Sequence, residues 1–83
     1  MRELEFSVRG AHIALDALLK ATGLAGSGGQ AKTLIAAGEV QVDGCIERRK
    51  TFKIRPGQVV RFGDARVRVV AHPANDAPGA VPG

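Results

Sequence analysis

Residues 27–55 constrain the fold most, because they combine a helix with both ends marked, a tight turn and a run of cations. The Ser27 hydroxyl can cap a helix, and Gln30 follows three residues later, as a capping box requires. Gly38 closes the pattern, since glycine readily adopts the left-handed conformation that ends many helices. The segment therefore predicts a short helix whose buried stripe consists of Ala31, Leu34, Ile35 and Gly38.

A strand and a hairpin turn are predicted directly after this helix. Val40 and Val42 point to one side of a strand and Gln41 to the other. Asp43-Gly44 is a strong hairpin signal, because a type I′ turn needs positive φ at both central positions. The return strand is expected to begin at Cys45, which we interpret as a small hydrophobic residue.

The flanking segments complete an α+β pattern. Residues 3–8 alternate like a half-buried strand, and residues 13–22 show the spacing of an amphipathic helix of about three turns ending at Gly23. Short alternating segments continue to residue 69. We therefore predict an N-terminal strand and a helical hairpin packed on a small antiparallel sheet. Residues 1–70 are expected to form a single domain, and residues 71–83, rich in Pro and Gly, a disordered C-terminal tail.

The charge distribution predicts a polyanionic partner. The net charge is +4, but residues 48–68 hold eight basic residues and one acid, whereas the rest holds four basic and seven acidic residues. A basic half beside a mildly acidic one is typical of proteins that bind nucleic acid. Trp and Tyr are absent and only three Phe occur, which argues against an RNA-binding sheet that stacks bases on surface aromatics.

The remaining composition bears on compartment and ligands. A single cysteine excludes an internal disulfide and fits a reducing compartment. No stretch approaches the ~20 apolar residues of a membrane helix, and acids stand where a signal peptide would carry basic residues. We expect a cytoplasmic monomer that has no membrane contact, no cofactor and no small-molecule substrate.

The start of the second helix is a candidate anion site. Gly28 and Gly29 leave the first-turn N–H groups unshielded, and Lys32 lies one turn later. The alternative is that the two glycines only make a flexible helix start. Residues 26–33 also nearly match the nucleotide-binding P-loop, but Ala31 replaces its second glycine and no buried strand precedes it, so nucleotide hydrolysis is not predicted.

The cations that follow the hairpin are the second candidate site. Acids are nearly missing from this part of the sequence, which favours a phosphate-binding surface over an ordinary solvated face. We expect this run to lie beside the glycine-rich helix start and to form one surface with it. The run consists of Arg48, Arg49, Lys50, Lys53 and Arg55.

Catalytic and metal-binding constellations are not indicated. Cys45, His12 and His72 lack the spacing of a zinc site, and Ser27, His12 and Asp16 lack any spacing that supports a catalytic triad. We therefore do not expect an enzyme.

Residues 31–44 resemble the alpha-L RNA-binding motif, the domain named after protein four of the small ribosomal subunit. The family pattern is A-[RK]-x-L-I-x-x-G followed by V-x-V-[DN]-G, and the chain matches it as AKTLIAAG and VQVDG. The likeness covers roughly residues 12–70, and the run SGGQAK with ERRK resembles the small free-standing bacterial members, the YbcJ-like proteins. Arginines often found near the start of each helix in the family are here Ala14 and Gly28.

The resemblance implies a helix pair on a small sheet and RNA contact by the second helix and the adjoining loop. We therefore predict a small RNA-binding protein that recognises structured RNA, such as rRNA or tRNA, with the ribosome as one place of action. The alternative is a protein-interaction adaptor whose basic face docks an acidic protein. The predicted RNA-binding residues are Gly28, Gly29, Gln30, Lys32, Arg48, Arg49, Lys50, Lys53 and Arg55.

Overall fold

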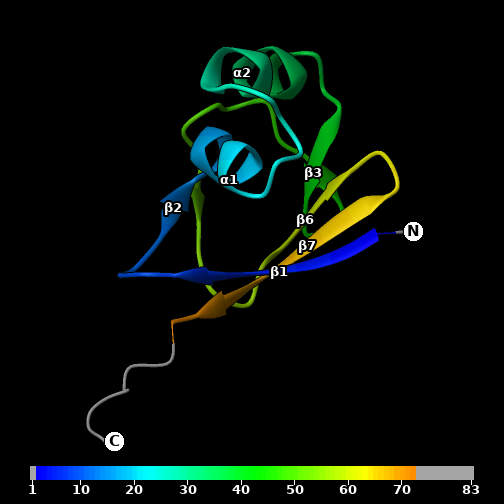
Figure 1. The fold of residues 1–83 in the computed structure, drawn as a ribbon. Helices are drawn as coiled ribbons and strands as arrows, with labels where there is room; N and C mark the ends of the chain where they lie inside the picture. The colour runs from blue at the N-terminus through cyan, green and yellow to red at the C-terminus, as the bar shows by residue number, and fades with distance from the viewer. Residues whose placement is uncertain (1, 73–83) are drawn as a thin grey trace, which may run out of the picture.

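A computed structural model describes residues 2–72, and residues 1 and 73–83 lie outside the described part (Figure 1). The expected disordered tail, residues 71–83, therefore falls almost wholly outside it. The exceptions are Ala71, which is the last residue of strand β7, and His72, whose N–H donates to the carbonyl of Val8 at 3.0 Å. The hydrogen-bonded sheet thus continues past residue 70, the boundary expected from the sequence.

A five-stranded sheet in the order β1-β7-β6-β3-β4 forms one layer of the molecule. Its strands are β1 (Arg2–Val8), β3 (Val40–Val42), β4 (Cys45–Ile46), β6 (Val59–Phe62) and β7 (Ala65–Ala71). The neighbours β7-β6, β6-β3 and β3-β4 are antiparallel, as predicted, but β1 runs parallel to β7. A parallel pair needs a long crossover, and everything between β1 and β7 supplies it.

Two helices, α1 (Leu15–Ala21) and α2 (Gly28–Ala36), lie together on one side of the sheet, which confirms the predicted α+β architecture (Figure 1). The predicted ends of α2 are confirmed. The Gln30 N–H donates to Ser27 Oγ at 3.1 Å, and Gln30 Oε1 accepts from the Gly26 N–H at 2.6 Å. Gly38 follows the helix with φ +80°.

Helix α1 is shorter than the predicted three turns, because its expected first turn is used elsewhere. Ile13–Ala14 forms strand β2, which pairs antiparallel with β5 (Lys53–Ile54) in a separate two-stranded sheet. The apolar spacing that suggested a longer helix at Ile13 therefore reflects a strand that packs against the same core. None of the helices among residues 2–72 has the length and apolar character needed to cross a membrane.

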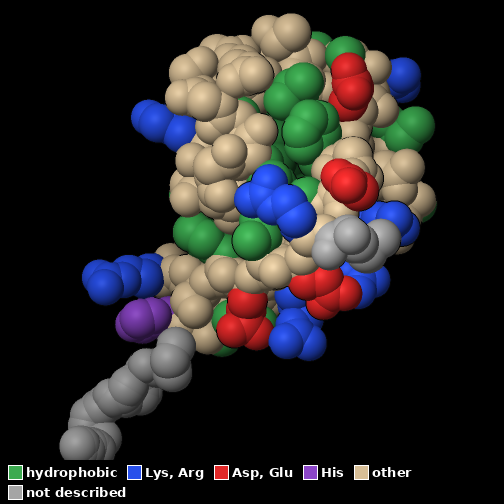
Figure 2. All heavy atoms as spheres, turned by 45° about the vertical axis from the view of Figure 1, so that its right-hand side comes forward, with side chains coloured by type: hydrophobic (Ala, Val, Ile, Leu, Met, Phe, Trp, Pro, Cys, Tyr) green, Lys and Arg blue, Asp and Glu red, His purple; other side chains and the backbone are tan. Residues whose placement is uncertain are grey.

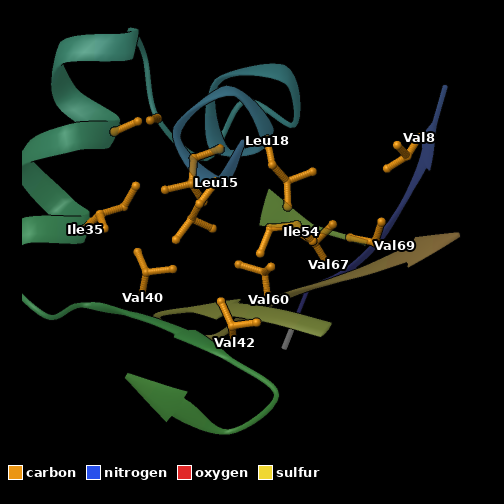
Figure 3. Close-up of a cluster of buried hydrophobic side chains, with 13 residues drawn as sticks. Val8, Leu15, Leu18, Ile35, Val40, Val42, Ile54, Val60, Val67 and Val69 are labelled. Atoms are coloured by element: carbon orange, nitrogen blue, oxygen red, sulfur yellow. The ribbon is translucent and has the colours of Figure 1, made fainter. Parts of the chain in front are cut away.

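The core fills the space between the helices and the inner face of the sheet (Figure 3). Leu15 and Leu18 of α1 and Ile35 of α2 meet valines from four strands of the sheet, and Ile54 of β5 closes the cluster. Each fully buried side chain of this size contributes roughly 1.5–3 kcal/mol relative to its exposed state. The valines are Val8, Val40, Val42, Val60, Val67 and Val69.

The predicted turn at Asp43-Gly44 is confirmed, and its aspartate also accepts hydrogen bonds from residues at the start of β6. Both residues have positive φ, +52° and +85°, as a type I′ turn requires. Asp43 Oδ1 accepts from the Val59 N–H and Oδ2 accepts from Gln58 Nε2, both at 3.0 Å. The aspartate therefore ties the β3-β4 hairpin to the start of β6.

Candidate nucleic-acid interface

The loop that carries the first cations is fixed to the beginning of α1. The Leu15 N–H donates to the carbonyl of Phe52 at 2.9 Å, and the Asp16 N–H donates to that of Lys50 at 3.0 Å. These two N–H groups belong to the first turn of α1, where a helix has no carbonyls of its own to offer. The loop backbone satisfies them, so α1 does not offer them to a phosphate.

Glu47 organises the loop from its other end. Its own N–H donates to the carbonyl of Val40 at 3.0 Å. Its Oε2 accepts from Arg49 Nε at 3.0 Å and from the Arg49 backbone N–H at 3.1 Å. The hydrogen bond from the Arg49 side chain, followed by that from its backbone, holds the pKa of the Glu47 carboxyl below its usual value. Glu47 is therefore an anchor for Arg49.

Arg49 is also held by an aromatic ring. Its Cζ lies 5.1 Å from the centroid of the Phe52 ring, within the range of a cation–π contact. The Arg49 side chain nevertheless remains 75% exposed, whereas that of Glu47 is 16% exposed. The guanidinium is thus oriented by two neighbours and still open to solvent.

Five cations of the predicted site line a single open hollow. They are Arg48, Arg49, Lys50, Lys53 and Arg55, all exposed. The other lining residues are Thr51, Phe52, Pro56 and Gln58, so no acid among residues 2–72 lines it. The hollow is kept in shape near Arg55 by its backbone N–H, which donates to Gln58 Oε1 at 2.8 Å. The expected cluster of cations is therefore present on one surface.

The structure places the first cation of this cluster, Arg48, at the opposite end of α2 from the glycine-rich start. The Arg48 guanidinium packs against Gly38, and a Cβ built on Gly38 would lie 2.7 Å from Arg48 Nη2. Gly38 follows the C-terminal end of α2, ten residues after Gly28, which corresponds to ~15 Å along a helix. The expectation that Arg48 lies beside the N-terminal end of α2 is wrong. The sequence could not show it, because the path of the chain after the hairpin decides which helix end the loop reaches.

The four predicted residues on α2 lie at its accessible N-terminal end. Gly29, Gln30 and Lys32 are exposed and Gly28 is half-buried. A Cβ built on Gly28 would meet nothing within 4 Å, and one on Gly29 would meet only Ser27 Oγ at 3.9 Å. The space in front of the first turn of α2 is therefore open.

The basic residues of β7 are paired with acids that the sequence places far away. The parallel register sets Glu3 opposite Arg66 and Glu5 opposite Arg68. Arg66 forms a salt bridge with Glu3, and Arg68 Nη2 lies 3.1 Å from Glu5 Oε2. The surface in Figure 2 accordingly shows acidic and basic side chains interleaved on one face. Although acids are scarce within residues 48–68, both arginines are therefore neutralised by acids of β1.

Two residues that organise the hollow were missed in the sequence analysis. Phe52 fell only within the short alternating segments predicted up to residue 69, and Glu47 only within the ERRK run. The spacing of Glu47 two residues before Arg49 was a visible signal for a local ion pair. The contact of Arg49 with Phe52 had no such signal, because it depends on a turn in which the Phe52 N–H donates to the Arg49 carbonyl at 3.2 Å.

Other candidate chemistry is limited in the described part of the chain. Residues 2–72 hold no group of three or more His, Cys, Asp or Glu side chains that could bind a metal ion. Cys45 is exposed on β4 rather than packed as a small hydrophobic residue, because it belongs to a short strand at the edge of the sheet.

Comparison with known proteins agrees with this architecture. The family model described as "S4 domain" matches residues 6–70. "Putative RNA-binding protein YbcJ" of Escherichia coli (strain K12) is 52% identical over 60 residues, covering 72% of this chain and 86% of that protein. "Uncharacterized protein YbcJ" of Shigella flexneri matches equally well.

A solved structure extends the likeness to three dimensions. The solution structure of E. coli YbcJ, described as revealing an alfaL motif involved in RNA-binding, superposes with a TM-score of 0.62 at 45% identity. The match covers 86% of this chain and 89% of that one. The resemblance predicted from residues 31–44 is thereby confirmed, and the chain belongs to the S4 domain family, which carries the alpha-L RNA-binding motif.

Proposed function

We propose that the protein binds structured RNA and that the five cations of the hollow contact its phosphates. The observation that carries this proposal is the hollow itself, which is lined by five exposed cations and by no acid of the described chain. A concave surface of one charge sign attracts a polyanion and lowers the cost of holding its phosphates close together. E. coli YbcJ supports RNA as the polyanion, since its name and the description of its solution structure both refer to RNA-binding.

The start of α2 provides a second contact in this proposal. Gly28 and Gly29 leave room for a phosphate at the first-turn N–H groups, and the exposed Gln30 and Lys32 flank that position. Gly28 and the site of Arg48 at Gly38 are ~15 Å apart along α2, so one RNA that contacts both must run along this helix. We expect folded RNA, such as rRNA or tRNA, to bind better than a flexible strand, because its phosphates are already ordered and less conformational entropy is lost on binding.

Phosphate contacts of this kind position an RNA more than they identify its sequence. If four to five cations of the hollow each neutralise a phosphate, log Kd should change with log salt with a slope of roughly 3–4.5. A site on the ribosome is compatible with such binding, because ribosomal RNA presents many folded segments.

Titrations at two salt concentrations test the proposal. Structured RNA, single-stranded RNA and duplex DNA are titrated against the protein and against Arg55→Glu and Arg61→Glu. Both variants make the same change at an exposed arginine, but Arg55 lines the hollow whereas Arg61 lies on the sheet in β6. We expect Arg55→Glu to weaken RNA binding strongly and Arg61→Glu to weaken it little.

A charge reversal of Arg48, Arg49 and Lys50 is the more severe version of the same test. RNA affinity that survives this triple reversal in a folded protein would refute the assignment of the hollow. If the protein binds all three nucleic acids with the same affinity and binds one acidic protein tightly, the adaptor function would replace the proposal.

A further inference from the structure

Resting on the proposed function, we propose that the hollow receives an unpaired nucleotide and that its base stacks on the Arg49 guanidinium. The protein would then prefer RNA with a bulge or an open loop over a continuous duplex. The contacts of Arg49 set it apart from its neighbours and carry this inference.

The Arg49 guanidinium already has two partners within the protein. The Phe52 ring lies beneath it at 5.1 Å, and its Nε donates to Glu47 Oε2 at 3.0 Å. The side chain is still 75% exposed, so most of it remains accessible to a ligand. A planar cation fixed in this way is a stacking platform that needs little further ordering, because its rotamer is already selected.

The other cations of the hollow lack this arrangement. Among residues 2–72, no other Lys or Arg lies over an aromatic ring. Lys50, Lys53 and Arg55 are exposed around the same hollow, where they can contact the phosphates on either side of a stacked base. A nucleotide has both parts, a flat base and a flanking phosphate at each end.

A continuous duplex cannot use the platform. Its bases are stacked inside the helix, so it presents mainly phosphates and sugars to a protein surface. Unpaired bases, in contrast, are regularly stacked on aromatic rings or on arginine guanidinium planes. The absence of Trp and Tyr from the sequence does not oppose this mode, because the outward surface is the guanidinium rather than a ring.

The test compares two RNA hairpins of equal length, one with a continuous stem and one with a single bulged 2-aminopurine. Wild-type protein should bind the bulged RNA about tenfold more tightly, which corresponds to the lower end of a base-stacking contribution. The 2-aminopurine fluorescence should fall on binding, because stacking quenches it. Affinity for the continuous stem provides the reference for phosphate contacts alone.

Arg49→Lys and its matched control Arg55→Lys make the readout specific. Each keeps the positive charge and removes the planar group. Arg49→Lys should abolish both the preference and the quenching, whereas its affinity for the continuous stem should change by the same factor as that of Arg55→Lys. Arg55→Lys should retain the preference. Thermal melts confirm that both variants are folded.

The possible failures are distinguishable. If both RNAs bind with the expected salt dependence but equally well, and the fluorescence is unchanged, the stacking inference is wrong while the proposed function stands. A preference that persists in Arg49→Lys also overturns it, since a planar group would then be unnecessary. If neither RNA binds with salt dependence, the proposed function and the inference fail together.

Discussion

Gly38→Ala tests how the end of α2 positions a cation of the hollow. Gly38 has φ +80°, and a Cβ at this residue would lie 2.7 Å from Arg48 Nη2 and 3.2 Å from Arg48 Cζ and Nε. The substitution therefore introduces backbone strain and removes the space in which the guanidinium rests. The two effects should be seen in different measurements.

The expected loss of stability comes from the backbone. An L-residue in the left-handed conformation costs roughly 1–2 kcal/mol. The clash with Arg48 should add little, because the far end of an exposed side chain can rotate away. For a domain of this size, each kcal/mol lowers Tm by about 4–8 °C, so Gly38→Ala should melt roughly 4–16 °C below the wild type.

Gly23→Ala is the matched control. Gly23 follows α1 with the same φ of +80°, but a Cβ there would meet nothing within 4 Å. Differential scanning calorimetry should therefore show similar destabilisation for both variants. A loss for Gly38→Ala that exceeds the Gly23→Ala loss by more than ~2 kcal/mol would contradict the assumption that Arg48 yields freely, since such a gap is comparable to overpacking a core.

RNA binding should separate the two variants. Gly38→Ala displaces the Arg48 guanidinium but keeps its charge, so affinity should fall a fewfold while the salt slope stays constant. Arg48→Ala should lower the slope by roughly 0.7–0.9, because one phosphate contact is lost. Equal RNA affinity of Gly38→Ala, Gly23→Ala and wild type would refute the role given to the contact between Gly38 and Arg48.

Four further predictions follow from single features. Gly29→Ala should raise Tm, since alanine is more favourable than glycine in a helix by up to ~1 kcal/mol and its Cβ has space there. The same Cβ should weaken RNA binding, because it would keep a phosphate away from the first-turn N–H groups. A higher Tm with unchanged RNA affinity would show that the start of α2 is not part of the interface. Asp43→Ala should cost roughly 2–3 kcal/mol in denaturant unfolding, because it loses two hydrogen bonds and strains the turn, whereas Asp43→Asn should recover most of this. The stabilisation from Glu47 should be complete above its unfolded pKa of ~4.3 and be lost as pH falls through its lower folded pKa, so an NMR titration should show no change in its loop from pH 5 to 8. Replacing Glu3 and Glu5 together by Gln should increase non-specific binding to nucleic acid.

Local chemistry explains why much of α2 and its turn could be predicted from the sequence. The Ser27 cap, the glycine after the helix and the Asp43-Gly44 turn each depend on hydrogen bonds or φ values within a few residues. The extra pairing at Ile13 could not be predicted, because its partner Ile54 lies 41 residues later in the chain. The same apolar spacing is compatible with a helix or with a short strand over one core.

The sequence predicted which cations share the candidate site, but it did not predict where they lie relative to α2. A run of cations without acids is expected to be exposed, and all five of its members line one hollow. Which end of α2 this run would reach depended on the loop that satisfies the first N–H groups of α1, including that of Leu15. The charge count within residues 48–68 also did not predict that Arg66 and Arg68 are neutralised, because their acidic partners are on β1.

The acids of β1 give the final prediction its physical basis. Glu3 and Glu5 face Arg66 and Arg68 through the parallel register, and exposed pairs of this kind contribute only about 0–1 kcal/mol to stability. Their larger effect is on the electrostatic field, because without them Arg61, Arg66 and Arg68 would form a second cationic surface on the sheet. The double Gln variant should therefore stay folded, bind duplex DNA more tightly at low salt, and lose less affinity than wild type when the hollow is mutated. Unchanged DNA binding would show instead that these arginines are too remote from any bound nucleic acid to matter, and that the acids do not confine binding to the hollow.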